Sequence, residues 1–275
     1  MQKVSVELLS RIDKFKSRYP SCFEEGVSIA GRVLGAYSAK KSTIAGEIFG
    51  LMFVCGQPEF RVDYLLFEQS LKLEQVNSWC LDRLGALREL GCNERLLTSA
   101  YLNFWNRSEG RVYGDVLNGS RNAEAANWVR LLTGFSNPFY SLCLAIINPS
   151  PVELVYAGTA SSMRIFIDDL NDVVSIEKDR RRNVLNVFSF TPSPAARILS
   201  KVADILELMG VFGESVVEKL STFMIDYIQW HLESSRYSEM SFETRRSRES
   251  WIQLIGMHKE YVGIGAHVPI LASPE

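Results

Sequence analysis

Five carboxylates fall within thirteen residues of an otherwise apolar stretch, IDDLNDVVSIEKD at positions 167–179. On a helix that turns about 100° per residue, Asn171, Ser175 and Asp179 share one face, and Asp168 falls on the same side. Their amide, hydroxyl and carboxylate oxygens are hard ligands suited to Mg²⁺. The residues alone leave two interpretations open, a divalent-metal site or an exposed polar face of a helix.

The segment NDVVSIEKD resembles the second metal motif of class I terpene synthases, usually written (N/D)DxxSxxxE. The resemblance implies that Asn171, Ser175 and Asp179 bind Mg²⁺ and that Lys178 contacts the diphosphate of the substrate. Asp179 stands where the family usually has a glutamate, which is one methylene longer. The overlapping DDLND (168–172) also reads as DDxxD, the first metal motif of the family.

Two further segments, in the order that the family has them, favour the second-motif interpretation. NWVRLLTG (127–134) resembles the helix-break segment, in which an arginine senses diphosphate. The resemblance implies that Arg130 is this sensor, that Gly134 is the effector whose carbonyl faces the new carbocation, and that Thr133 links the two. WHLESSRY (230–237) resembles the C-terminal Arg-Tyr pair, which implies that Arg236 and Tyr237 bind the diphosphate.

One part of the family pattern is missing. Members normally carry DDxxD on a helix well upstream of the sensor arginine, but the best positional match here, EIFGLMFVCGQPEF (47–60), has Gly56 and Gln57 where aspartates are expected. Glu59 and Asp63 follow and could supply carboxylates, although ordinary surface positions are the simpler interpretation. The loss would reduce the number of metal ions, weaken their binding or abolish ionisation, and Asp168 is a candidate to compensate in part.

The elements that must position these residues are helices. Apolar residues recur at steps of three and four, as in LLFEQSLKLEQVNSWCLDRLGAL (65–87) and ILSKVADILELMGVF (198–212), and alternating patterns are scarce. Proline and glycine mark the breaks, for example at Pro20, Gly91 and Pro194. The pattern predicts an all-α fold of one domain over residues 1–275, with a tail or lid from about residue 260. The resemblance implies a bundle around a central apolar cavity.

Composition excludes several classes of function. The net charge of −2 predicts no nucleic-acid partner. The five cysteines are odd in number and form no CxxC pair, and no segment resembles a signal peptide, so reduced thiols and a cytoplasmic location are expected. Apolar runs stop after about ten residues, too short to span a bilayer. The three histidines are too scattered for a HExxH zinc site, and His231 is expected to belong to a satisfied helix face.

The predicted function is a class I terpene cyclase that ionises a linear prenyl diphosphate, farnesyl first and geranylgeranyl next, with Mg²⁺ as cofactor. Two alternatives remain open: a prenyltransferase of the same fold, which normally bears two Asp-rich motifs, and a non-catalytic isoprenoid-binding protein. Because dimers are common in the family, a homodimer is a further expectation.

Overall fold

The computed structural model describes residues 16–55, 69–104, 136–147, 157–190, 194–209, 214–238, 240 and 242–262. Within these ranges every regular element is a helix and none is a strand, which confirms the prediction of an all-α protein. The more specific expectation, a terpene-synthase type of bundle around an apolar cavity, stays a prediction.

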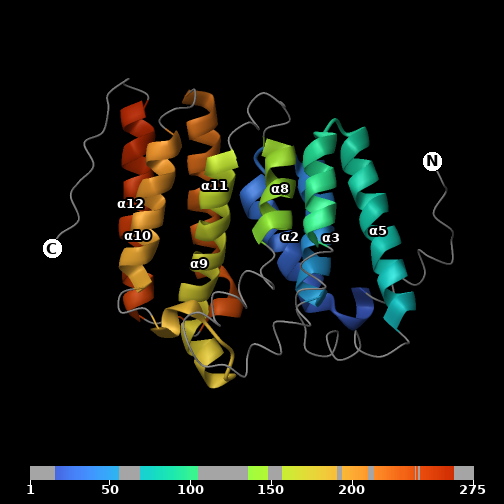
Figure 1. Ribbon diagram of the computed structural model, residues 1–275, viewed down its shortest axis with the longest axis horizontal. Helices are drawn as coiled ribbons and strands as arrows, with labels where there is room; N and C mark the ends of the chain where they lie inside the picture. Colours follow the sequence, from blue (N-terminus) through green and yellow to red (C-terminus); the bar gives the residue numbers. More distant parts are fainter. Residues whose placement is uncertain are drawn as a thin grey trace. The chain divides into compact units, whose positions relative to one another are not determined.

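The helices group into two compact units, each of which is described by itself. The first unit contains residues 94–104, which are helical, and four longer helices: α2 (Pro20–Leu34), α3 (Ala39–Cys55), α5 (Gln69–Glu89) and α8 (Ser136–Ile147). The second unit contains four α-helices and two short 3₁₀ helices: α9 (Ala157–Arg181), η2 (Val187–Phe190), α10 (Pro194–Met209), α11 (Glu214–Glu233), η3 (Ser235–Tyr237) and α12 (Phe242–Val262) (Figure 1). The expectation of a single domain stays a prediction.

Proline and glycine mark helix boundaries where the sequence predicted breaks. Pro20 opens α2 and Pro194 opens α10, at first-turn positions that need no backbone donor. Gly91 follows α5 with φ of +81°, a backbone conformation that glycine adopts without a steric cost. At the C-terminal end α12 continues to Val262, two residues into the segment expected to be a tail, and residues 263–275 lie outside the described residues.

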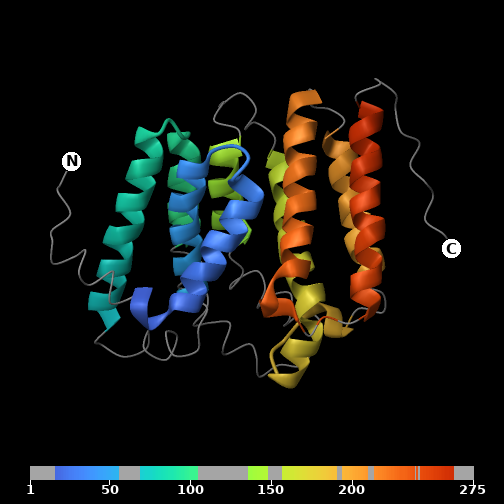
Figure 2. The ribbon, with the colours of Figure 1, turned by 180° about the vertical axis from the view of Figure 1, so that it is seen from behind.

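Glycines let α2 and α3 approach closely in the first unit, where both views show the two helices side by side (Figures 1 and 2). A Cβ atom on Gly26 would collide with the backbone of Gly46 and Gly50. A Cβ on Gly50 would in turn lie 2.8 Å from the Cα of Phe23. These three glycines form what we call the glycine seam, and it exists because none of them has a side chain.

The second unit places its charged segment on a largely buried helix. α9 buries Met163, Phe166, Leu170 and Val173, all less than 4% exposed, among the other helices of this unit. Tyr227 of α11 donates a hydrogen bond to the carbonyl oxygen of Ile167, at 3.4 Å, which ties α11 to α9. The acidic segment 167–179 therefore lies on a packed helix and not on an isolated solvated one.

Candidate metal and diphosphate site

The end of α9 is built so that the chain turns back onto the helix. Asn183 has a φ of +58°, its N–H bonds to the carbonyl of Arg180, and the N–H of Val184 bonds to the carbonyl of Asp179. This pattern is a Schellman motif, in which a left-handed residue, often glycine or asparagine, closes the last turn. Arg180, Arg181 and Arg182 are exposed at this end, as expected for a solvated helix terminus.

Two of the three predicted metal ligands contact each other on α9. The hydroxyl of Ser175 donates a 2.6 Å hydrogen bond to Oδ2 of Asp179, one turn further along the helix. Ser175 is buried and Asp179 is half-buried. Asn171, one turn earlier, completes the row of three that the spacing predicted, which we call the α9 stripe.

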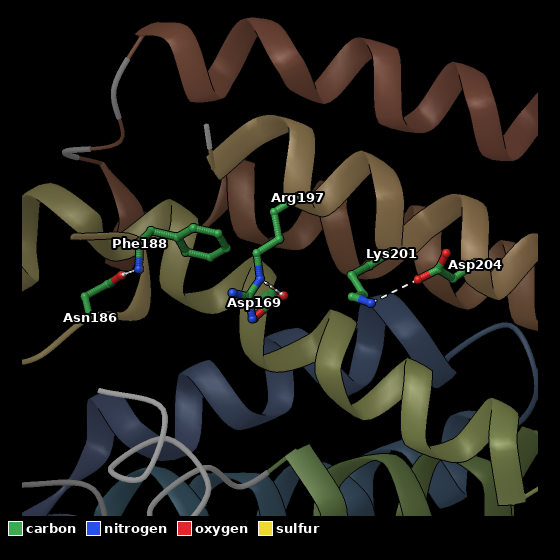
Figure 3. A network of polar contacts seen from close by, with 6 residues as sticks. All are labelled: Asp169, Asn186, Phe188, Arg197, Lys201 and Asp204. Carbon is green, nitrogen blue, oxygen red and sulfur yellow. Dashed lines mark hydrogen bonds and ion pairs between the residues drawn. The ribbon is translucent and has the colours of Figure 1, made fainter. Parts of the chain in front are cut away.

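Asn186 supports the α9 stripe from the chain that returns after the Schellman motif. Its Nδ2 donates one hydrogen bond of 2.8 Å to Oδ2 of Asp179 and another of 2.8 Å to the carbonyl oxygen of Asp172. Its Oδ1 accepts a hydrogen bond of 2.9 Å from the N–H of Phe188, which Figure 3 draws. The side chain is only 1% exposed, so both amide hydrogens and the amide oxygen are satisfied inside the protein.

The sequence interpretation did not single out Asn186. Its one signal is local: an amide between Leu185 and Val187, in a run that is otherwise apolar. A polar residue at such a position must find buried partners, and here they are the groups of the α9 stripe.

Tyr237, the predicted tyrosine of the Arg-Tyr pair, reaches the stripe across 66 residues of chain. Its hydroxyl donates a 2.8 Å hydrogen bond to Oδ1 of Asn171. Residues predicted to bind metal and diphosphate from separate motifs therefore meet at one place in the second unit.

Aromatic rings on α11 hold Tyr237 in position. Phe223, Tyr227 and His231 are spaced four residues apart on one face of α11, with ring centroids 5.9 Å and 4.4 Å apart along the row. The His231 ring then stacks on Tyr237 at 4.8 Å with an interplanar angle of 29°. Trp230 lies edge-on to both His231 and Tyr237. The buried stack restricts where the tyrosine hydroxyl can point.

His231 is a neutral member of this stack. It is 1% exposed, and its pKa is lowered from 6.5 to about 3, mainly because burial disfavours the charged ring. The hydrogen bond to the Tyr227 carbonyl opposes this shift, and the charges of Arg236 and Lys178 add to it. Its Nδ1 lies 2.9 Å from the carbonyl oxygen of Tyr227, so the neutral ring carries its proton on Nδ1 and donates it there. The expectation that His231 belongs to a satisfied helix face is confirmed.

Two cationic side chains gather at the ring of Tyr237. The Lys178 ammonium lies 5.1 Å from the ring centroid, and the Arg236 guanidinium carbon lies 5.8 Å from it. Both distances fall within the range of cation–π attraction. Three of the four residues predicted to bind diphosphate, Lys178, Arg236 and Tyr237, thus lie together beside the α9 stripe, and two of them bring a positive charge.

The donor chemistry of the stripe fits a magnesium ion. Mg²⁺ takes oxygen ligands, and the stripe offers an amide, a hydroxyl and a carboxylate oxygen. Oδ2 of Asp179 accepts two hydrogen bonds, one of 2.6 Å from Ser175 and one of 2.8 Å from Asn186. Among the described residues, no three His, Cys, Asp or Glu side chains form a metal group. A site here would use mixed oxygen donors.

Other charged residues of the acidic segment point elsewhere. Asp169 is buried and accepts hydrogen bonds of 2.9 Å and 3.2 Å from the guanidinium of Arg197 on α10 (Figure 3). Glu177 forms an exposed pair with Arg180 at 3.0 Å. Both orientations agree with the helical-face prediction, which placed these two carboxylates off the stripe. Asp168 is half-buried on α9.

Several predicted residues lie outside the described part of the chain. These are the sensor, linker and effector positions, together with the upstream carboxylate candidates: Arg130, Thr133, Gly134, Glu59 and Asp63. Their roles stay predictions.

Comparison of the chain with protein-family models, with curated proteins and with solved structures found no match. Among the helices that the structure describes, none is both long and apolar enough to cross a membrane. The functional interpretation therefore depends on the residues and on the geometry given above.

Proposed function

We propose that this protein is a class I terpene cyclase, which ionises a linear prenyl diphosphate with the help of Mg²⁺ and cyclises the resulting carbocation. The observation that carries the proposal is the hydrogen bond from Tyr237 to Asn171, at 2.8 Å. It joins two segments that were assigned to the same site from separate motifs, far apart in the sequence. An arbitrary arginine-tyrosine pair would have no reason to lie against the stripe.

In the proposed mechanism Asn171, Ser175 and Asp179 hold the metal through their oxygens. When bound, Mg²⁺ neutralises the charge that develops on the departing diphosphate. Lys178 and Arg236 add positive charge on the same side. The single hydrogen of the Tyr237 hydroxyl bonds to Asn171, so this hydroxyl donates to the diphosphate only after it exchanges that partner. Lys178 and Tyr237 are positioned before substrate arrives. Lys178 is part of α9, and the ring of Tyr237 packs against the aromatic rings of α11.

The neutral state of His231 suits this chemistry. A charged imidazolium under Tyr237 would be a third cation beside Lys178 and Arg236, and burial prevents it by lowering its pKa to about 3. His231 then acts as an uncharged ring on which the tyrosine stacks. In the undescribed segment, Arg130, Thr133 and Gly134 are proposed as sensor, linker and effector.

The two alternative functions differ from the cyclase in the fate of the diphosphate and in whether a second substrate is added. A prenyltransferase would extend its substrate with isopentenyl diphosphate, and an isoprenoid-binding protein would retain the diphosphate. The missing first Asp-rich motif is the feature that keeps the binding protein as an alternative. The Asp168 carboxylate is the proposed partial substitute, and Asp168→Ala with full activity would refute that role.

The test is incubation of purified protein with geranyl, farnesyl and geranylgeranyl diphosphate, with Mg²⁺ or with EDTA. Extracts are analysed by gas chromatography–mass spectrometry, and released diphosphate is measured in parallel. A Mg²⁺-dependent cyclic hydrocarbon or alcohol is the expected result. Chain extension after addition of isopentenyl diphosphate would indicate the transferase, and binding without release of diphosphate would indicate the carrier.

A further inference from the structure

We infer that Asn186 is a positioning residue for the metal site, which fixes the Ser175 and Asp179 oxygens in a geometry that can receive a divalent cation. The inference rests on the proposed metal-binding role of the α9 stripe. It goes beyond that role because Asn186 lies after α9, outside every motif that carries the resemblance.

Asn186 orients the Asp179 carboxylate together with Ser175. Oδ2 of Asp179 accepts from Ser175 at 2.6 Å and from Asn186 at 2.8 Å. Two donors on one oxygen hold the carboxylate in a single rotamer and leave Oδ1 free of these two contacts. A ligand that must otherwise be ordered by the metal is thus ordered beforehand.

Asn186 also influences where the proton of Ser175 is donated. A hydroxyl has one hydrogen, and the 2.6 Å contact with Asp179 uses it, while the alternative acceptor, the carbonyl of Asp172, lies at 3.4 Å. Asn186 occupies that carbonyl at 2.8 Å, which favours donation by Ser175 toward Asp179. Asn186 Nδ2 also lies 3.5 Å from the Ser175 oxygen, and this long contact takes one lone pair and leaves the other available to a cation.

Asn186 is itself held by the chain that follows it. Its Oδ1 accepts from Phe188 N–H at 2.9 Å, and the guanidinium of Arg197 lies 5.4 Å from the centroid of the Phe188 ring. Arg197 is in turn bound to the buried Asp169 of α9 (Figure 3). The returning chain is thereby fixed against α9 at a second point, and the Asn186 amide has one orientation that satisfies all its partners.

The test uses two variants of Asn186. Asn186→Ser keeps an acceptor for the Phe188 N–H but is too short to reach Asp179. Asn186→Leu keeps the branched shape and the same number of side-chain heavy atoms, without any donor or acceptor. Asn103→Ser is the matched control, since Asn103 makes the same kind of amide contact, 2.8 Å to the carbonyl of Ser99, in the first unit. Folding of each protein is checked by circular dichroism and thermal unfolding.

The readout is binding of Mn²⁺ in the presence of inorganic diphosphate, followed by electron paramagnetic resonance, with the Mg²⁺ concentration for half-maximal turnover measured beside it. Loss of a residue that orients a ligand typically weakens metal affinity by roughly 10- to 100-fold, and this is expected for both Asn186 variants. The Asn103→Ser protein should stay within about twofold of the parent.

Three outcomes decide the inference. Weaker Mn²⁺ binding in a folded Asn186 variant supports it, even if no prenyl diphosphate is turned over and the proposed function fails. Unchanged Mn²⁺ binding with reduced thermal stability overturns it and leaves Asn186 a purely structural residue. No Mn²⁺ binding by the parent protein with diphosphate overturns the metal site and the inference together, whatever the product assay gives.

Discussion

At the scale of single residues, the oxygen of Asn171 serves two partners. It accepts the hydroxyl of Tyr237 at 2.8 Å, and it is the first ligand of the proposed metal. An amide oxygen has two lone pairs, so one acceptor position remains when the tyrosine is bound. In the proposed site, Asn171 therefore links the residues assigned to the metal with Tyr237, which is assigned to the diphosphate.

Loss of a stripe residue should abolish turnover. Asn171→Ala and Ser175→Ala each remove an oxygen ligand, and the loss should exceed the roughly 10- to 100-fold typical of residues one contact away from a metal. Glu177→Gln is the control on the same helix, because its exposed pair with Arg180 contributes little to stability. Steady-state diphosphate release measures the effect, and substantial activity in both alanine variants would show that the site is misassigned.

The Tyr237 hydroxyl can be removed without removing its ring. In Tyr237→Phe the stack on His231 stays, and the loss of one hydrogen-bond donor should lower turnover by about tenfold while thermal stability changes little. Tyr101→Phe is matched to it, since Tyr101 also donates to an asparagine, Asn77, at 2.7 Å in the first unit. Equal kinetics for the two variants would argue against a role of Tyr237 at the site.

The spacing of residues on one helix predicted the α9 stripe and the orientation of Asp169 and Glu177, because helical geometry fixes both. The resemblance assigned Tyr237 and Asn171 to one site but did not predict their contact, since no local rule brings together residues 66 apart. Asn186 was missed because its partners follow from the left-handed turn at Asn183. An asparagine at the end of a helix does not by itself predict such a turn.

At the scale of elements, the glycine seam shows how α2 and α3 are held at close distance. A methyl group on Gly26 would meet the α3 backbone, which cannot move aside as a side chain can. The sequence predicted a break at Pro20, which is where α2 begins, but no pairing of α2 with α3. Their close crossing could not be predicted, because glycine in a helix pattern reads only as a weak helix former.

Two glycines of α2 should respond in opposite directions to the same substitution. Gly26→Ala should lower the free energy of unfolding by about 1–3 kcal/mol through overpacking. Gly31→Ala should raise it by about 0.5–1 kcal/mol, because alanine is the better helix former. A Cβ at Gly31 has no atom within 4 Å. Urea unfolding of both variants measures the difference, and a stabilised Gly26→Ala protein would contradict the seam.

At the scale of the whole molecule, the free energy of unfolding should depend on pH because of His231. Its pKa is about 3 in the folded protein and near 6.5 when unfolded, so the unfolded chain binds more protons between these values. Stability from this residue is complete above pH 6.5 and falls as the pH decreases toward 3. Each unit of difference is worth about 1.4 kcal/mol, so the total loss is several kcal/mol.

Unfolding of the parent protein and of His231→Phe, measured from pH 7 to pH 4, isolates this contribution. The variant should lose less stability over the interval than the parent does, whatever its stability at pH 7. Identical slopes would mean that His231 titrates normally in the folded protein and is not enclosed as the structure has it.

The hydrogen bond between Tyr237 and Asn171 also has a thermodynamic consequence. If a cation on α9 changes how tightly η3 is held, then the position of η3 must change the affinity for the cation by the same factor, since linkage between two equilibria is reciprocal. Metal loading and placement of the arginine-tyrosine pair are then one coupled event. A ligand that binds Tyr237 and Arg236 would thereby change the affinity of the α9 stripe for the cation.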